Sequence, residues 1–172
     1  MNQDSIDAAA RARQDSIDRA AREAQERDEA ERRRQQQLAD SLAAIGRTGE
    51  AVRTLLATMI HFDYDKANIR SDDAGVLDQK VSILQANPNL RIRIAGHCDE
   101  RGSDEYNLAL GNRRATSSKQ YLVSHGIEAG RIETVSYGEE RPLAPGHDEA
   151  SWAQNRRDEF EIIAGGDQLR QP

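Results

Sequence analysis

Two kinds of hydrophobic spacing alternate after residue 55, and this alternation limits the fold more than any other feature. Leu90, Ile92 and Ile94 are separated by Arg91 and Arg93, which is the two-residue period of a strand with one buried face. Other segments repeat their apolar residues every three, four or seven positions, as amphipathic helices do. Alternating strands and helices predict an α/β (α+β) sandwich, with helices packed on a sheet and right-handed crossovers.

The expected order of elements is β-α-β-α-β-(α)-β. A serine followed by two aspartates is typical of a helix start, asparagine-proline of a helix end, and glycine of a left-handed helix cap. The predicted elements are a strand over 55–62, a helix from Ser71 to Asn87-Pro88, a strand over 90–94, a helix from Asp104 to Gly126, a strand over 132–137, a short helix over 149–154 and a strand around Phe160 and Ile162.

The first 40 residues have a different composition from the rest of the chain. The sequence QDSID at 3–7 recurs at 14–18, and neither proline nor glycine occurs before Gly46. Alanine, arginine, glutamate and glutamine favour helix, and an eleven-residue repeat is typical of a straight or slightly right-handed coil. Two alternatives follow: a solvated helix, frayed or disordered when alone, or a coiled coil that associates with itself or a partner. Gly46 and Gly49 predict a break in the helix.

These patterns divide the chain into three parts. We expect a charged helical or partly disordered arm over 1–50, a folded domain over 51–164 and a disordered tail over 165–172. The net charge of −6 argues against nucleic acid as a partner. No apolar run reaches the ~20 residues of a membrane helix. The first residues lack a signal peptide, so the protein is intracellular or its export signal was removed.

The segment GHCDERGSDEYNLALGNRR, residues 96–114, carries the strongest candidate for chemistry. Catalysis by a cysteine–histidine pair is disfavoured because His97 and Cys98 are neighbours at a strand end and point to opposite faces. The other three histidines are scattered, so we predict no metal site and no cofactor. Two interpretations stay open: a solvated charged turn, or a receptor for a small zwitterion.

The receptor interpretation follows from helical spacing. Asn107 and Arg114 are seven residues apart and share one helix face, and Leu110 lies one turn before Arg114. The preceding loop can fold back and bring Asp99 across this face. A carboxylate, a guanidinium and an amide are complementary to an ammonium group beside a carboxylate, as in an α-amino-acid end.

Four segments together resemble the OmpA-like peptidoglycan-binding family. They are FDYDKANI, GHCDERGSDEYNLALGNRRA, VSYGEERP and GHDEASWAQNRRDEF, which lie in the family's order between Phe62 and about Ile163. The resemblance implies a mixed four-stranded sheet with two main helices on one face. It also implies non-catalytic binding of peptidoglycan through the diaminopimelate residue of the stem peptide.

The resemblance assigns roles to individual residues. It implies that Asp99 and Arg114 grip the ammonium and the carboxylate of diaminopimelate, and Cys98 stands where the family usually has threonine. Further ligand contacts are expected from Asn107, Leu110, Phe62, Asp63 and Tyr64, with Arg157 as a supporting arginine.

The resemblance also implies a cellular setting. A periplasmic tether would hold the cell wall and reach the outer membrane through a lipid anchor that this chain does not contain, with TolB and TolA as partners. Three alternatives stay open. The first is another OmpA-like wall anchor, either stator-like as in MotB or porin-associated. The second is a coiled-coil structural protein with an inert domain, and the third is an enzyme acting on peptidoglycan. The sequence leaves open whether the wall contains diaminopimelate or lysine.

Overall fold

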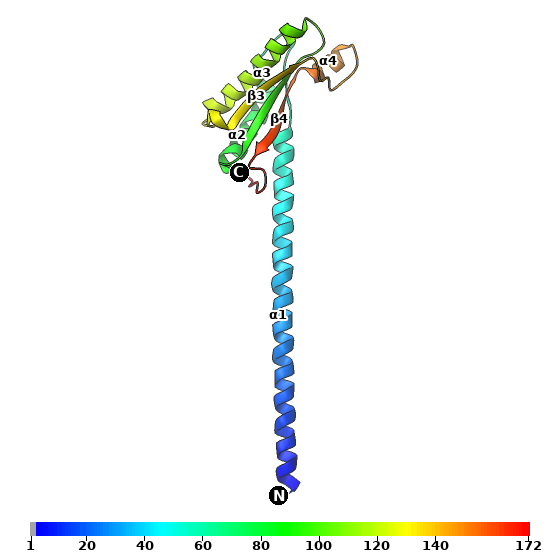
Figure 1. Cartoon of the computed structure of the whole chain (residues 1–172), viewed down its shortest axis with the longest axis vertical. Coiled ribbons are helices and arrows are strands. Elements are labelled where there is room, and N and C mark those ends of the chain that lie inside the picture. Colours follow the sequence, from blue (N-terminus) through cyan, green and yellow to red (C-terminus); the bar gives the residue numbers. More distant parts are fainter. Residues whose placement is uncertain (1–2) are drawn as a thin grey trace. The chain divides into compact units, whose positions relative to one another are not determined.

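The computed structural model describes residues 3–172, which divide between Gly46 and Arg47 into two compact units. Helix α1 (Gln3–Ala57) belongs to both (Figure 1). In the first unit every described side chain between residues 13 and 44 is exposed, and pairs such as Glu23–Arg27 lie one turn apart on its surface. This unit is helical, as the composition of the arm predicts.

The predicted break at Gly46 and Gly49 is wrong, because α1 continues through both glycines to Ala57. Each glycine costs a helix about 1 kcal/mol relative to alanine. Burial of Val52 and Leu56, which are 0% and 1% exposed, more than offsets this cost.

The predicted first strand is also mostly wrong. Residues 55–57 end α1, and only Ile60–His61 form β1. Val52, Leu56 and Ile60 are buried four residues apart, whereas Leu55 is 41% exposed. A short apolar run fits a helix or a strand equally well, and here tertiary packing selects the helix.

The sheet contains four strands in the order β1-β4-β2-β3. Strands β2 (Arg91–His97) and β3 (Ile132–Gly138) are parallel, and β4 (Arg157–Ala164) runs antiparallel to both β2 and β1. The sheet is therefore mixed, as expected.

Two main helices cover one face of this sheet, α2 (Ser71–Ala86) and α3 (Asp104–Ser124) (Figure 1). On β2, Ile92 and Ile94 are fully buried in the same cluster as side chains of both helices, while the alternating Arg91 and Arg93 pair with Glu133 on the opposite face. A 3₁₀ turn (Ala129–Arg131) precedes β3, and α4 (Glu149–Asn155) precedes β4.

The helix ends follow the sequence signals only in part. Arg70, not Ser71, occupies the N-cap of α2, and its side chain makes no capping hydrogen bond. At α3, Ser103 caps the helix by accepting a hydrogen bond from the backbone N–H of Tyr106 at 3.3 Å. Gly126 has the predicted left-handed conformation, with φ of +91°.

The C-terminal tail is held against the domain, in contrast to the predicted disorder over 165–172. Leu169 is 4% exposed and belongs to the main core cluster. The amide of Asn87 donates to the carbonyl oxygen of Arg170 at 2.9 Å and accepts from the N–H of Arg170 at 2.8 Å. The polar turn after α2 needs hydrogen-bond partners, and the tail supplies them.

A close contact between two glycines sets the distance between α3 and β2. A Cβ atom on Gly96 would lie 1.9 Å from the carbonyl oxygen of Gly111. This approach brings the first half of α3 against the carboxyl end of β2. None of the helices between residues 3 and 172 is both long and apolar enough to cross a membrane.

Candidate ligand-binding site

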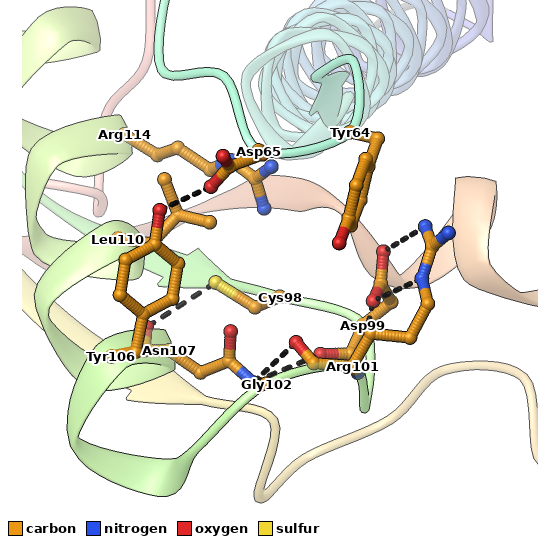
Figure 2. A pocket seen from close by; sticks show the side chains of 10 residues that line it. All are labelled: Tyr64, Asp65, Cys98, Asp99, Arg101, Gly102, Tyr106, Asn107, Leu110 and Arg114. Atoms are coloured by element: carbon orange, nitrogen blue, oxygen red, sulfur yellow. Dashed lines mark hydrogen bonds and ion pairs between the residues drawn. The ribbon is translucent and has the colours of Figure 1, made fainter.

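A cavity of about 210 Å³ lies where the carboxyl end of β2, the start of α3 and the loop after β1 meet. Figure 2 shows its wall, to which two aspartates and two arginines contribute. The lining residues are Tyr64, Asp65, Cys98, Asp99, Arg101, Gly102, Tyr106, Asn107, Leu110 and Arg114.

Arg114 is completely buried and joins two segments of backbone. Its Nε, Nη1 and Nη2 donate to the carbonyl oxygens of Lys66 at 2.8 Å, His97 at 2.9 Å and Asp63 at 3.1 Å. The guanidinium carbon lies 5.1 Å from the ring centre of Phe62. A guanidinium has five N–H donors, so these three hydrogen bonds leave two N–H groups unused.

Asp99 is 4% exposed and is surrounded by donors. Its Oδ1 accepts from the N–H of Arg101 at 3.1 Å and from Arg101 Nε at 3.0 Å, and its Oδ2 accepts from Arg101 Nη2 at 2.8 Å. Arg156 Nη1 lies 3.5 Å from the same Oδ2. Burial acts to raise the pKa of Asp99, but the hydrogen bonds from Arg101 outweigh it and hold this pKa below its usual value.

Arg101 is held between two aromatic rings. Its guanidinium carbon lies 3.9 Å from the ring centre of Tyr64 and 4.1 Å from that of Trp152. Trp152 belongs to α4 and donates its indole N–H to Glu100 at 2.9 Å. The loop after β2 is thereby attached to α4, and Arg101 is kept facing Asp99.

Asn107 holds the same loop from the side of α3. Its amide nitrogen donates to the carbonyl oxygens of Asp99 at 3.3 Å and Arg101 at 3.2 Å, and to Glu139 Oε2 at 2.7 Å. The Cys98 thiol donates to the carbonyl oxygen of Asn107 at 3.2 Å. These contacts make Asn107 a support for the loop as well as part of the cavity wall.

The structure brings five of the predicted ligand-binding residues to one cavity. These residues are Tyr64, Asp99, Asn107, Leu110 and Arg114. Of the other two, Phe62 is fully buried outside the lining, and Asp63 contributes its carbonyl oxygen to Arg114. The Asp63 side chain points elsewhere and lies 3.8 Å from Arg70.

Arg157 does not reach the cavity. Its side chain bonds to Glu159 and to the carbonyl oxygen of Arg141. The preceding residue, Arg156, is the one that approaches Asp99, and its Nε also donates to the carbonyl oxygen of Phe62 at 2.9 Å. The sequence does not distinguish Arg156 from Arg157. Which of the two approaches Asp99 depends on the direction that each side chain takes at the start of β4.

Sequence reasoning also missed Arg101, Tyr106 and Asp65. Arg101 is absent from the predicted site, although it lies only two residues after Asp99 and its guanidinium bonds to both carboxylate oxygens. Asp65 lies in the same FDYDK segment as Tyr64, and its φ of 56° could not be read from the sequence.

Nucleophilic chemistry is unfavourable here. Burial raises the pKa of the Cys98 thiol to about 11, so the thiolate is scarce at neutral pH. Burial, followed by the nearby Arg157, lowers the pKa of His97 to about 4. Within residues 3–172, no three histidine, cysteine or acidic side chains gather in a way that could hold a metal ion.

The site is thus a polar cavity at one end of a mixed sheet that two helices cover. The OmpA family matches residues 61–156, more than half of the chain, and the chain belongs to this family. It is 45% identical over 122 residues to the peptidoglycan-associated lipoprotein of Pseudomonas putida, covering 71% of this chain and 73% of that relative.

Two further comparisons also find similarity to peptidoglycan-associated lipoproteins. The peptidoglycan-associated lipoprotein of Pasteurella multocida is 47% identical over 98 residues, which are 57% of this chain and 65% of that relative. The crystal structure of the peptidoglycan-associated lipoprotein from Burkholderia pseudomallei superposes with a TM-score of 0.61 at 42% identity, covering 63% of this chain and 92% of that structure.

Proposed function

We propose that the domain binds peptidoglycan without covalent chemistry, through the free amino-acid end of diaminopimelate in the stem peptide. One observation carries the proposal: two carboxylates and two guanidinium groups line a single cavity, Asp65 and Asp99 with Arg101 and Arg114. This balanced set matches a ligand that is itself a zwitterion. The names of the relatives from Pseudomonas putida and Burkholderia pseudomallei support peptidoglycan as the source of that ligand.

The ligand carboxylate binds the two N–H groups of Arg114 that the backbone carbonyls leave unused. Because this guanidinium is buried, charge-assisted hydrogen bonds to it are stronger than at the surface. The ammonium group lies on the side of Asp99. Leu110 and Tyr64 cover the methylene groups between the two ends of diaminopimelate.

The sharpest test changes the ligand and leaves the protein unaltered. We expect calorimetric titration with a diaminopimelate stem peptide to give at least about tenfold tighter binding than titration with the lysine analogue, which lacks the second carboxylate. Equal affinity for the two peptides would contradict the role of Arg114. Peptidoglycan incubated with the protein should yield no new fragments on chromatography, whereas cleavage products would favour an enzyme.

We further propose that the full-length protein is a periplasmic tether, attached to the outer membrane by a lipid anchor and working with TolB and TolA. The relatives at 43–50% identity are named lipoproteins, which supports the anchor. Labelled palmitate should be incorporated by the native gene product in cells, and the protein should copurify with TolB. Fractionation with the inner membrane would instead favour a stator-like anchor.

A further inference from the structure

We propose that a second hollow, beside the cavity, binds the sugar chain of peptidoglycan, so that the domain contacts both the stem peptide and the glycan that carries it. This inference rests on the proposed function and adds a second site and a second ligand class to it. The hollow has a volume of about 320 Å³ and lies between the loop after β1 and the middle of α3. We call it the polar groove, and its polar lining residues are Asn68, Asn112, Arg113, Thr116, Ser117 and Gln120.

The polar groove differs in chemistry from the cavity. Two carboxylates and two guanidinium groups line the cavity, whereas the described residues that line the groove include no carboxylate and a single cation, Arg113. The other polar groups there are side-chain amides and hydroxyls. Such groups offer donors and acceptors without charge, so they suit an uncharged ligand rich in hydroxyl and amide groups.

These amide and hydroxyl side chains are available to a ligand. Within residues 3–172, none of the five makes a hydrogen bond to another protein group. The adjacent buried positions of α3 behave differently, because Arg114 and Ser118 use their donors inside the protein. Single polar side chains on a helix surface bond to water, but here five of them gather in one hollow with walls from two segments.

The arrangement on α3 places this set on one side of the helix. Asn112, Thr116 and Gln120 follow one another at intervals of four residues, and each lies one turn from the next. Elsewhere the exposed surface of α3 includes charged and apolar side chains, such as Glu105 and Leu108. The uncharged polar groups are therefore concentrated where α3 faces the loop after β1.

The polar groove continues the cavity along the same two segments. On the loop, Asp65 lines the cavity and Ala67 lines the groove. On α3, Tyr106 lines the cavity, and the guanidinium carbon of Arg113 in the groove lies 5.6 Å from the centre of its ring. One ligand can therefore extend from the cavity into the groove.

The spacing of the two hollows suits peptidoglycan. Its diaminopimelate is the third residue of a peptide attached to N-acetylmuramic acid, so three links of ~3.5 Å, or roughly 10 Å, separate it from the sugar. From Leu110 in the cavity to Ser117 in the groove, α3 rises by about 10 Å. A stem peptide bound in the cavity therefore places a sugar, with its hydroxyl and N-acetyl groups, at the polar groove.

The test compares two ligands by calorimetric titration. One is the diaminopimelate stem peptide with an acetylated N-terminus, and the other is the same peptide carried by the disaccharide of N-acetylglucosamine and N-acetylmuramic acid. We expect the wild-type protein to bind the disaccharide ligand at least about fivefold more tightly, because the groove adds hydrogen bonds within the same complex. Equal or weaker binding of the disaccharide ligand would overturn the inference.

Variants show whether the groove provides this gain. Asn112→Ala combined with Gln120→Ala removes two amides from the helix wall, and alanine favours the helix. This double variant should bind the disaccharide ligand no more tightly than the peptide, and Asn68→Ala on the opposite wall should reduce the same gain. Gln79→Ala removes an exposed amide from α2 and should keep the full gain.

The outcomes separate this inference from the proposed function. If the wild-type protein binds neither ligand, the proposed function fails. If it binds both but the double variant keeps the full gain, the sugar binds outside the polar groove and only this inference fails. Equal weakening of both ligands by the double variant also overturns it, because the two residues would then support the cavity.

Discussion

At the scale of single residues, the candidate site depends on side chains that also hold the fold together. Arg114 makes its three hydrogen bonds to backbone carbonyl oxygens on two different segments, the loop after β1 and the end of β2. Its burial lowers the pKa of the guanidinium, yet arginine stays charged at any physiological pH. A residue in this position serves ligand and structure at once.

We therefore expect Arg114→Ala to destabilise the domain by about 3 kcal/mol or more, because three buried or partly buried carbonyl groups lose their donor. Urea unfolding followed by circular dichroism measures this. The adjacent Arg113→Ala removes an exposed arginine and should change the unfolding free energy by no more than about 0.5 kcal/mol. Equal stability of the two variants would show that the carbonyl contacts contribute little.

Asp158 is a second buried ionisable residue, and it predicts how the stability of the domain depends on pH. Burial raises its pKa to about 8, the Ser118 hydroxyl donates to Oδ2, and Oδ1 has no partner within the described part of the chain. The folded-state pKa is above the unfolded value of about 4. The stability that this proton provides is therefore complete below pH 4 and is lost as the pH rises towards 8.

Between these limits the wild-type protein should lose up to about 1.4 kcal/mol of unfolding free energy per pH unit relative to Asp158→Asn. The amide keeps an acceptor for Ser118 and has no charge to bury. Parallel urea titrations at pH 5 and pH 8 measure the difference. If the gap between wild type and variant is the same at both pH values, Asp158 does not bind its proton in the folded state.

At the scale of elements, the packing of α3 on β2 places the cavity. Gly96 on β2 and Gly111 on α3 are in backbone contact, and a Cβ on Gly111 would lie 2.2 Å from the Ser136 Oγ on β3. The helix could not approach the sheet this closely with larger residues at these positions. Asn107, Leu110 and Arg114 would then be displaced from the loop that carries Asp99.

Gly96→Ala should consequently cost at least about 3 kcal/mol, since its methyl group would overlap backbone that cannot rotate away. Gly75→Ala provides the contrast, because nothing lies within 4 Å of its added Cβ in the interior of α2. This second change should stabilise the protein by about 0.5–1 kcal/mol. Thermal unfolding of both variants tests the pair, and the prediction fails if Gly96→Ala is neutral.

At the scale of the whole molecule, every core residue in the described part of the chain belongs to the second unit. The core cluster begins at Val52 and includes Leu56, both at the end of α1. The ammonium of Lys80 donates to the carbonyl oxygens of Leu55, Leu56 and Thr58 at this helix end, where carbonyl groups run out of helical N–H partners. The last turns of α1 are therefore part of the folded domain.

A protein consisting of residues 47–172 should have the same unfolding free energy as the full chain within about 0.5 kcal/mol. Removing residues up to 57 should cost at least about 3 kcal/mol, because two buried aliphatic side chains and two of the three carbonyl partners of Lys80 are lost. Urea unfolding of the two truncated proteins tests this. A lower stability of 47–172 than of the full chain would mean that the arm contributes to the domain.

The sequence by itself determined the order of strands and helices from residue 71 onward, because periods of two and of three to four residues are local properties. Its four family segments also pointed to the aspartate and arginine that share the cavity. Tertiary structure alone decided where α1 ends, whether the tail is ordered, and that Asp99 is already occupied. One of the donors to Asp99 is Arg156, which lies 57 residues from it. Contacts over such separations are formed by packing, and local periodicity carries no record of them.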